Sequence, residues 1–438
     1  MAQWKALSQD ERLAVLKRYQ SGEELSDLAR EVGVATTSLD RYFRALKAEL
    51  RGDAPLEVKI SQVVLEDNPQ LPDNFEVFEL LKKRPYSLEE LSNKFDRSKE
   101  TIRNLLQSMV DEGYVIEVEN DKAAFTGKDT TRKIRSDLIP STLADEQGHI
   151  VVFAVASDLH AGSAYSQPTN HTKFIKIAYE EYGVRHIFKP GDETTGVNGY
   201  RGQEYDMIPA FRNLGSKSAP KITEGQIWLA DKYNPVLPGL KYYILGGNHD
   251  YWHVVNSGVD AVAKLCCQRD DMYFLGYDVA DIPLTDRVDV RLTHPSGGVP
   301  YSFSYRLQKS VESMAFDELY RAAVEEENPR MRILLAGHLH IEVKFHRGPM
   351  MAAHVGCFEG QTNYLKRKGL YPTIGGGIFK VWLTDGGLIQ RVEYTFIPFF
   401  EIMDDWQNWG IPDFLDDAVG QPDDLDTLFQ INQEKIPV

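Results

Sequence analysis

Five short clusters of polar residues recur along the middle of the chain, and their side chains are of the types that bind metal ions. They are Asp158-Leu159-His160, Gly191-Asp192, Gly246-Gly247-Asn248-His249-Asp250, Thr293-His294 and Gly337-His338-Leu339-His340. Carboxylate, imidazole and amide ligands together suit divalent metals such as manganese, iron or zinc. A lone histidine is usually an ordinary surface or core residue, but five such clusters in series predict a metal centre.

Each cluster follows an apolar run that is typical of a buried strand. The runs are the first half of Ile150–His160, followed by Arg185–Phe188, Tyr242–Leu245, Val290–Thr293 and Arg332–Ala336. Helical patterns at Thr172–Tyr182 and Val259–Gln268 separate some of them, and residues 378–395 read as a hairpin that turns at Asp385-Gly386-Gly387. This order predicts an α/β domain over residues 149–400, with the clusters at the strand ends where sites collect in such sheets.

The five clusters also match a known pattern, DxH, GD, GNH(D/E), H and GHxH. Over roughly residues 150–345 the sequence therefore resembles the calcineurin-like metallophosphoesterases. The resemblance implies an α/β fold of four layers, a β-sandwich flanked by helices, with two divalent metal ions in the site. Manganese is the expected metal, with iron or zinc as alternatives.

The resemblance also implies a role for each residue of the pattern. The first metal would be held by Asp158, His160 and His340, the second by Asn248, His294 and His338, and Asp192 would bridge the two. A hydroxide held by both metals would attack phosphorus, His249 would protonate the leaving oxygen, and Asp250 would orient His249. The sequence departs from the family pattern in two places. Glu193-Thr194-Thr195, after Asp192, lacks the acidic-aromatic pattern of the family's repair exonucleases, and Pro295 follows His294 where the family commonly has glycine.

The chain before residue 150 predicts two small helical modules. Residues 1–51 resemble the helix-turn-helix of resolvases and transposases, with Ser38, Arg41 and Arg44 on the outer face of the recognition helix. The alternative is a three-helix module that docks on protein.

Residues 73–128 predict three helices and a hairpin, which resemble a winged helix-turn-helix with Lys99 and Arg103 as DNA contacts. Its hairpin carries Glu117, Glu119 and Asp121, which would repel phosphate, so a protein-interaction or dimerisation role is the alternative. Residues 129–148 read as a linker that begins with a short basic stretch.

The charge of the whole chain is unevenly distributed. The formal net charge is -16, and residues 401–438 contribute ten acidic side chains and one basic. This acidic tail could bind a protein partner, whereas the overall charge disfavours indiscriminate binding of polyanions. Three cysteines without metal-type spacing, no signal-peptide core and no apolar span lead us to expect a cytoplasmic protein that does not enter membranes.

Together these patterns predict a metallophosphoesterase that acts as a DNA phosphodiesterase, an endo- or exonuclease of a phage or mobile element whose N-terminal modules bind DNA. One alternative is a nucleotide or phosphomonoester phosphatase whose helical modules form a homo-oligomer. Another is a catalytically silent DNA-binding regulator, which the complete ligand set disfavours.

Overall fold

The chain divides into two compact units, residues 1–71 and residues 72–438. The structure, a computed structural model, describes residues 72–127, 142–214, 218–298, 302–324, 330–347, 350–403 and 406–418, together with residues 15, 17, 18 and 28. The helix-turn-helix expected over residues 1–51, with its candidate contacts Ser38, Arg41 and Arg44, therefore lies almost wholly outside the described residues. So does most of the acidic tail.

Residues 72–127, called here the three-helix segment, contain the three helices and the hairpin that the sequence predicts. The elements are α5 (Asn74–Leu81), β1 (Tyr86–Ser87), α6 (Leu88–Phe95), α7 (Lys99–Asp111), β2 (Ile116–Glu119) and β3 (Lys122–Phe125). The strands form an antiparallel sheet in the order β1-β3-β2. Ser87 and Glu90 exchange the two hydrogen bonds of a capping box at the start of α6, and Leu91 and Leu106 are buried beneath.

A six-stranded sheet follows, and it holds most of the strands that the sequence predicts. Its strands are β4 (Ile150–Val155), β5 (His186–Pro190), β6 (Lys241–Gly246), β7 (Met272–Tyr277), β13 (Gly375–Leu383) and β14 (Ile389–Pro398). Strands β4 to β7 run parallel, while β13 pairs antiparallel with β4 and with β14. The carboxyl ends of β4, β5 and β6 therefore lie at one edge of the sheet.

A second sheet has five strands in the order β11-β12-β10-β9-β8. They are β8 (Val279–Pro283), β9 (Val288–Thr293), β10 (Met331–Ala336), β11 (Glu342–Arg347) and β12 (Met350–Val355). Strand β10 lies between β9 and β12 and is parallel to both, so these three strands also end at a common edge.

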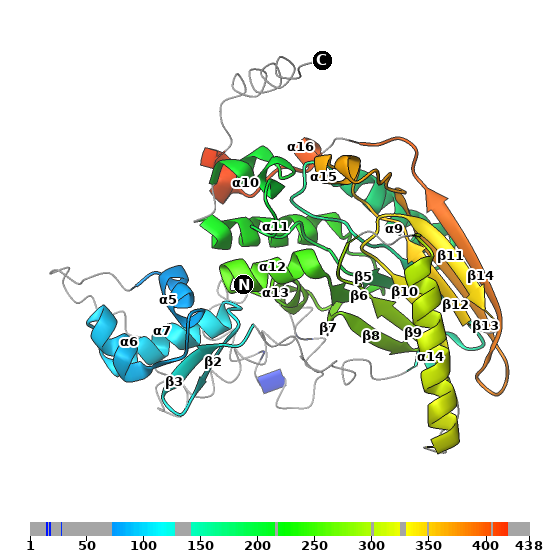
Figure 1. The fold of residues 1–438 in the computed structure, drawn as a ribbon, viewed down its shortest axis with the longest axis horizontal. Helices are drawn as coiled ribbons and strands as arrows, with labels where there is room; N and C mark the ends of the chain where they lie inside the picture. Colours follow the sequence, from blue (N-terminus) through cyan, green and yellow to red (C-terminus); the bar gives the residue numbers. More distant parts are fainter. Residues whose placement is uncertain are drawn as a thin grey trace, which may run out of the picture. The chain divides into compact units, whose positions relative to one another are not determined.

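The two sheets pack face to face and helices cover their outer faces, which gives the four layers that the sequence predicts (Figure 1). The alternation of side chains along β4 explains why both faces of this sheet are covered. Val151, Phe153 and Val155 point into the core between the sheets, whereas Ala154 faces the helices. The six-stranded sheet is covered by α9 (Pro168–Glu181), α11 (Ala219–Tyr233) and α13 (Ala261–Gln268), and α10 (Pro209–Leu214) contributes to the same core. The long α14 (Tyr305–Val324) covers the other sheet.

The shorter elements lie in the connections between these layers. They are α8 (Leu143–Gln147), η2 (Gln203–Tyr205), α12 (Asn248–Ser257), α15 (Asn363–Arg367), α16 (Trp406–Trp409) and η4 (Asp413–Ala418). Among the helices that the structure describes, none combines the length and the hydropathy that crossing a bilayer requires.

Helix α12 connects the strand end of β6 to the three-helix segment. Gly258, which ends α12, accepts a 2.7 Å hydrogen bond from the amide of Val115. A Cβ atom at Gly258, whose φ is +82°, would lie 2.6 Å from the ring of Phe78, and Val259 belongs to the core of the three-helix segment. The three-helix segment is thus packed against the far end of the helix whose first residue is Asn248.

Candidate metal centre

The seven predicted ligands are brought together by the common edge of the parallel strands. Asp158 and His160 follow β4, Asp192 follows β5 and Asn248 follows β6. The remaining ligands come from the other sheet, where His294 follows β9 and the pair His338 and His340 follows β10. The polar cluster therefore forms across the two sheets at the ends of five strands.

Asp158, His160 and His340 form the first group, in which the donor atoms lie close enough to hold one ion. Nε2 of His340 lies 3.3 Å from Oδ1 of Asp158 and 3.1 Å from Nε2 of His160. All three side chains are buried. The amide of His338 donates to both carboxylate oxygens of Asp158, at 3.0 and 3.1 Å, and so fixes that carboxylate.

Asn248, His294 and His338 form the second group around one amide oxygen. Oδ1 of Asn248 lies 3.1 Å from Nε2 of His294 and 3.0 Å from Nδ1 of His338. The other ring nitrogen of each histidine meets a backbone carbonyl, Pro190 at 2.7 Å and Gly297 at 2.8 Å. Because a carbonyl can only accept, those nitrogens carry a proton, and the inward nitrogen of each ring is the one that can bind a cation.

Asp192 lies between the two groups. Its Oδ2 is 3.0 Å from Nε2 of His294 and 3.7 Å from Nε2 of His160. Its Oδ1 accepts a 2.9 Å hydrogen bond from the amide of His249. A carboxylate in this position can contribute to both groups at once, as a bridging ligand does.

The backbone at this edge adopts an unusual conformation. Of the seven predicted ligands, five have positive φ, namely Asp158, His160, Asp192, His338 and His340, with values between 49° and 80°. A left-handed conformation costs a residue with a side chain roughly 1–2 kcal/mol. Such strain collects at functional sites, where the surroundings hold it in place.

Two glycines allow the close approach. A Cβ atom at Gly247 would lie 2.2 Å from Oδ1 of Asp192, and one at Gly337 would lie 2.5 Å from Oγ of Ser157. These two glycines of the predicted pattern are therefore required by space, because a side chain would collide with the neighbouring atoms.

The electrostatics follow from burial and from the proximity of carboxylates and imidazoles. Burial alone would raise the pKa of Asp192, but His294 and His249 hold it well below its usual value. Burial would also lower the pKa of His294, yet Asp192 raises it to about 9. Burial and the nearby His249 lower the pKa of His160 well below its usual value. Concentrated carboxylate charge beside His160, an imidazole that burial keeps neutral, is an environment that attracts cations.

These residues fit a pair of divalent cations. The donors are carboxylate oxygen, amide oxygen and imidazole nitrogen, the mixture that manganese, iron and zinc accept. Two buried Nε2 atoms 3.1 Å apart, those of His160 and His340, would repel each other unless a proton or a cation lies between them. The role of the seven residues as ligands and the number of ions remain predictions, which these distances favour.

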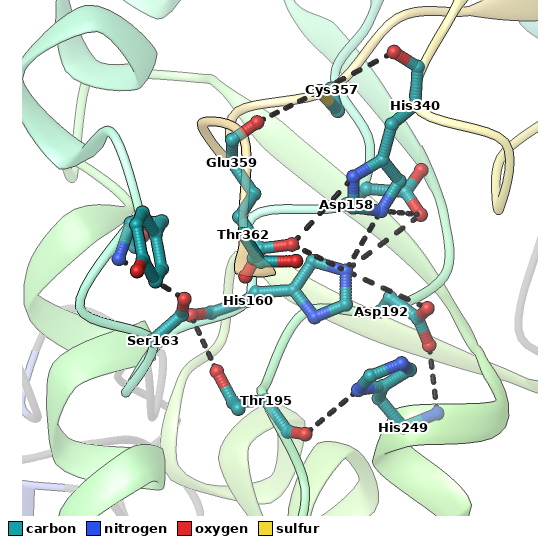
Figure 2. Close-up of polar contacts among 12 residues, drawn as sticks. Asp158, His160, Ser163, Asp192, Thr195, His249, His340, Cys357, Glu359 and Thr362 are labelled. Carbon is teal, nitrogen blue, oxygen red and sulfur yellow. Dashed lines mark hydrogen bonds and ion pairs between the residues drawn. The ribbon is translucent and has the colours of Figure 1, made fainter. Parts of the chain in front are cut away.

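His249 stands beside both groups, half-buried at the start of α12. Its Nδ1 lies 2.8 Å from the carbonyl of Thr195, and its ring centre lies 4.5 Å from that of His160 (Figure 2). The carbonyl of Thr195 holds the proton on Nδ1, so Nε2 is the ring atom left for proton transfer.

The expected pairing of Asp250 with the His249 ring is wrong. The carboxylate of Asp250 instead accepts hydrogen bonds from the amides of Glu193, Thr194 and Gly247, at 3.1, 2.8 and 2.9 Å, and from the Thr194 hydroxyl at 2.6 Å. It sits in the first turn of α12, where its side chain reaches back to cap the helix. Asp250 thus holds the loop after Asp192, and the carbonyl of Thr195 orients His249.

Glu359 is a buried acidic residue at the site that the motif did not include. Its Oε2 lies 3.8 Å from Nε2 of His160 and 3.6 Å from Nδ1 of His340, and Figure 2 shows it pointing at both rings. Burial raises its pKa to about 7. Glu359 follows β12, which is apolar and parallel to β10, so the rule that located the other clusters at strand ends could have found it.

The two described candidates for DNA contact, Lys99 and Arg103, lie exposed on α7. Lys99 is 3.2 Å from Glu89, while Arg103 is 2.7 Å from Glu100 and 3.2 Å from Asp121 on the hairpin. Exposed ion pairs such as these are weak and can exchange for a phosphate partner. Neither residue belongs to the groups of possible metal ligands.

No family model and no curated protein matches the sequence. Solved structures do resemble the fold. They include an uncharacterized protein of Streptococcus pneumoniae described as a predicted phosphoesterase (14% identity, TM-score 0.24, covering 57% of this chain and 98% of that one). Vacuolar Protein Sorting 29 of Cryptosporidium parvum is similar at 14% identity and TM-score 0.28 (57% and 98%), as is a 5′-nucleotidase precursor of Thermus thermophilus at 10% and 0.27 (61% and 57%). At these scores the likeness adds nothing on activity, which depends on the site.

Proposed function

We propose that this chain is a metallophosphoesterase that hydrolyses the phosphodiester bonds of DNA with the help of two divalent cations. The observation that carries the proposal is the position of Asp192, one carboxylate shared between two groups of buried or half-buried ligands. Such a pair of sites is suited to in-line displacement at phosphorus, where charge builds up on both the attacking and the leaving oxygen.

When bound, the two cations would neutralise charge on the phosphoryl oxygens and make water acidic enough to serve as a nucleophile near neutral pH. The chain's own residues then perform the remaining tasks. His249 offers Nε2 toward the centre while the carbonyl of Thr195 fixes its tautomer, so it can give a proton to the leaving oxygen. Asp250 holds the backbone of Glu193 and Thr194, and this fixes the loop that carries Asp192.

The three-helix segment supports DNA as the substrate. Its order of helices and hairpin is that of a winged helix, in which the last helix enters the major groove. In this chain that helix is α7, and Lys99 and Arg103 lie exposed on it. The helix-turn-helix predicted over residues 1–51 would add a second point of contact.

One observation favours the alternative, a nucleotide or phosphomonoester phosphatase whose N-terminal modules assemble a homo-oligomer. Arg103 is already paired with Glu100 and Asp121, and the same hairpin carries the exposed Glu117 and Glu119. Carboxylates in this position would oppose the approach of a DNA backbone.

Activity on matched substrates distinguishes the two. The full chain with manganese would be assayed on plasmid and linear DNA, on bis-p-nitrophenyl phosphate and on p-nitrophenyl phosphate, with Asp192→Asn as the inactive control. DNA cleavage together with diester hydrolysis supports the proposal, whereas hydrolysis of the monoester alone supports the phosphatase. Inactivity with every metal would contradict both and leave a DNA-binding regulator.

A charge-reversal pair tests the DNA contacts separately. In Lys99→Glu/Arg103→Glu the affinity for long DNA should fall about ten-fold or more and the salt dependence should weaken, because two phosphate contacts are lost. Hydrolysis of the small diester should not change. Lys173→Glu/Lys176→Glu, on the exposed face of α9, is the matched control.

A further inference from the structure

Three aromatic side chains extend from His249 toward solvent, and they come from three separate segments of the chain. The ring centre of Trp252 on α12 lies 4.1 Å from that of His249. Tyr200, from the loop after Asp192, lies 6.2 Å from His249 and 5.7 Å from Trp252. Tyr364 on α15 continues the series, 5.5 Å from Tyr200. We call Tyr200, Trp252 and Tyr364 the aromatic wall.

The aromatic wall does not belong to the apolar interior. None of its three side chains is part of the core clusters formed by the described residues, and Tyr364 is 40% exposed. Large aromatic rings left at a surface beside a reactive group are more typical of ligand binding than of packing.

The rings are nevertheless held in place. The hydroxyl of Tyr200 donates to Oδ2 of the buried Asp206 at 3.0 Å, and Asn363, the neighbour of Tyr364, approaches Oδ1 of Asp206 at 3.4 Å. One carboxylate therefore ties the loop of Tyr200 to the start of α15. A Cβ atom at Gly199 would lie 1.9 Å from the Trp252 ring, so the glycine lets this loop pack directly on the indole. The wall is thus preorganised before any ligand arrives.

Basic side chains border the outer end of the wall. Lys366, Arg367 and Lys368, which follow Tyr364 after the buried Leu365, are exposed, and Nζ of Lys368 lies 5.7 Å from the centre of the Tyr364 ring. Arg201, next to Tyr200, is also exposed. Flat rings next to a row of cations match the two repeating parts of a nucleic-acid strand, the base and the phosphate.

We propose that the aromatic wall and the basic residues of α15 bind unpaired nucleotides of a single DNA strand, next to the phosphate held at the metal centre. This inference rests on the proposed function and makes it specific. A base can stack on Tyr364 and Tyr200 only if it is free of its partner strand, because both faces of a paired base are covered by its neighbours. The site therefore selects single-stranded regions, strand ends or flaps over intact duplex.

Binding should be measured with the inactive Asp192→Asn protein, so that the substrate survives. A fluorescent thymidine oligonucleotide and a duplex of the same length are titrated at fixed salt by anisotropy. The single strand should bind more tightly than the duplex. Adding Tyr364→Ala should weaken binding of the single strand about ten-fold, the loss typical of one stacked base.

Two control variants distinguish the loss of base stacking from a general loss of DNA binding. Tyr364→Phe keeps the ring and should retain binding, while Tyr371→Ala removes a more exposed tyrosine outside the wall and should have no effect. With an oligonucleotide that carries abasic sites in place of its bases, Tyr364→Ala should no longer weaken binding. Equal binding of single strand and duplex, or an effect of Tyr364→Ala that persists on the abasic strand, would overturn the inference.

The binding experiment and the hydrolysis assay can fail independently of each other. If the wild-type chain fails to cleave any DNA yet binds a single strand through Tyr364, the hydrolytic proposal fails and the stacking site stands. If DNA is cleaved but Tyr364→Ala binds as the parent does, the stacking site fails alone.

Discussion

Nε2 of His160 and Nε2 of His340, 180 residues apart in the sequence, face each other at 3.1 Å in a buried setting. Oδ1 of Asp158 lies within 4.0 Å of both nitrogens, and Oε2 of Glu359 lies 3.8 Å from Nε2 of His160 and 3.6 Å from Nδ1 of His340. Without a cation, one imidazole must be protonated, and the structure must hold several carboxylates close together with little solvent to screen them. The metal-free protein should therefore have a lower free energy of unfolding than the metal-bound protein.

Metal binding should accordingly stabilise the fold. Manganese at about a hundred times its dissociation constant should add about 2.7 kcal/mol to the free energy of unfolding, which corresponds to a rise of several degrees in Tm. Differential scanning calorimetry of the chelated protein with and without manganese measures this. The rise should shrink in Asp192→Asn, and an equal rise in that variant would contradict a shared carboxylate.

His249→Ala should lower kcat on a phosphodiester roughly 10²- to 10⁴-fold, because the leaving oxygen loses its proton donor. The metal content, measured by mass spectrometry of the purified protein, should remain that of the wild type. His346→Ala, which removes an exposed histidine from β11, is the control. Loss of metal together with activity would instead make His249 a ligand.

Asp250→Asn should destabilise the protein as well as inactivate it. The carboxylate accepts four hydrogen bonds, and an amide would turn an N–H group toward donors. A loss of roughly 2–5 kcal/mol in the free energy of unfolding is expected in urea titrations. Asp270→Asn, at an exposed turn, should change little. Full stability with lost activity would return Asp250 to a direct catalytic role.

Gly258→Ala tests the connection between α12 and the three-helix segment. The new methyl group meets the Phe78 ring as well as an unfavourable φ, so the free energy of unfolding should fall by more than the roughly 1–2 kcal/mol of backbone strain alone. Gly183→Ala is the matched control, since Gly183 has φ +68° and open space around it. Equal losses in the two variants would show that the contact with Phe78 carries no energy.

The buried His186 predicts a pH dependence of stability. Burial lowers its pKa to about 4, against the effect of nearby Glu146, which lies 3.3 Å away. The unfolded chain takes up a proton near pH 6.5 and the folded chain does not, so this stability is present above pH 6.5 and declines toward pH 4. The decline should reach at most about 2 kcal/mol at pH 5, and urea titrations of His186→Gln should show a correspondingly flatter profile.

The sequence was sufficient to locate the seven candidate ligands because each lies in a short motif directly after an apolar strand. The parallel strands bring their ends together whatever the length of chain between them, and the family resemblance then assigned His160 and His340 to the same metal. The starts of α6 and α7 at Ser87 and Ser98 are also predictable from local sequence. A helix N-cap depends only on the cap residue and the three or four residues that follow it.

What the sequence did not reveal depends on side-chain direction and on contacts between distant segments. Asp250 follows His249, but in the first turn of a helix its side chain points back toward Thr194 rather than along to its neighbour. Glu359 has no motif of its own. The aromatic wall unites Tyr200, Trp252 and Tyr364 from three loops and helices, and no local pattern relates them.

Helix α12 begins with Asn248 at the candidate metal centre and ends at Gly258 against the three-helix segment. Ten residues of α-helix form a stiff rod about 15 Å long. If the proposed function holds, DNA bound by α7 would therefore reach the metal centre at a fixed distance from the place where α7 contacts it. Cleavage would then occur at a constant number of nucleotides from each binding site, instead of at random positions along the strand.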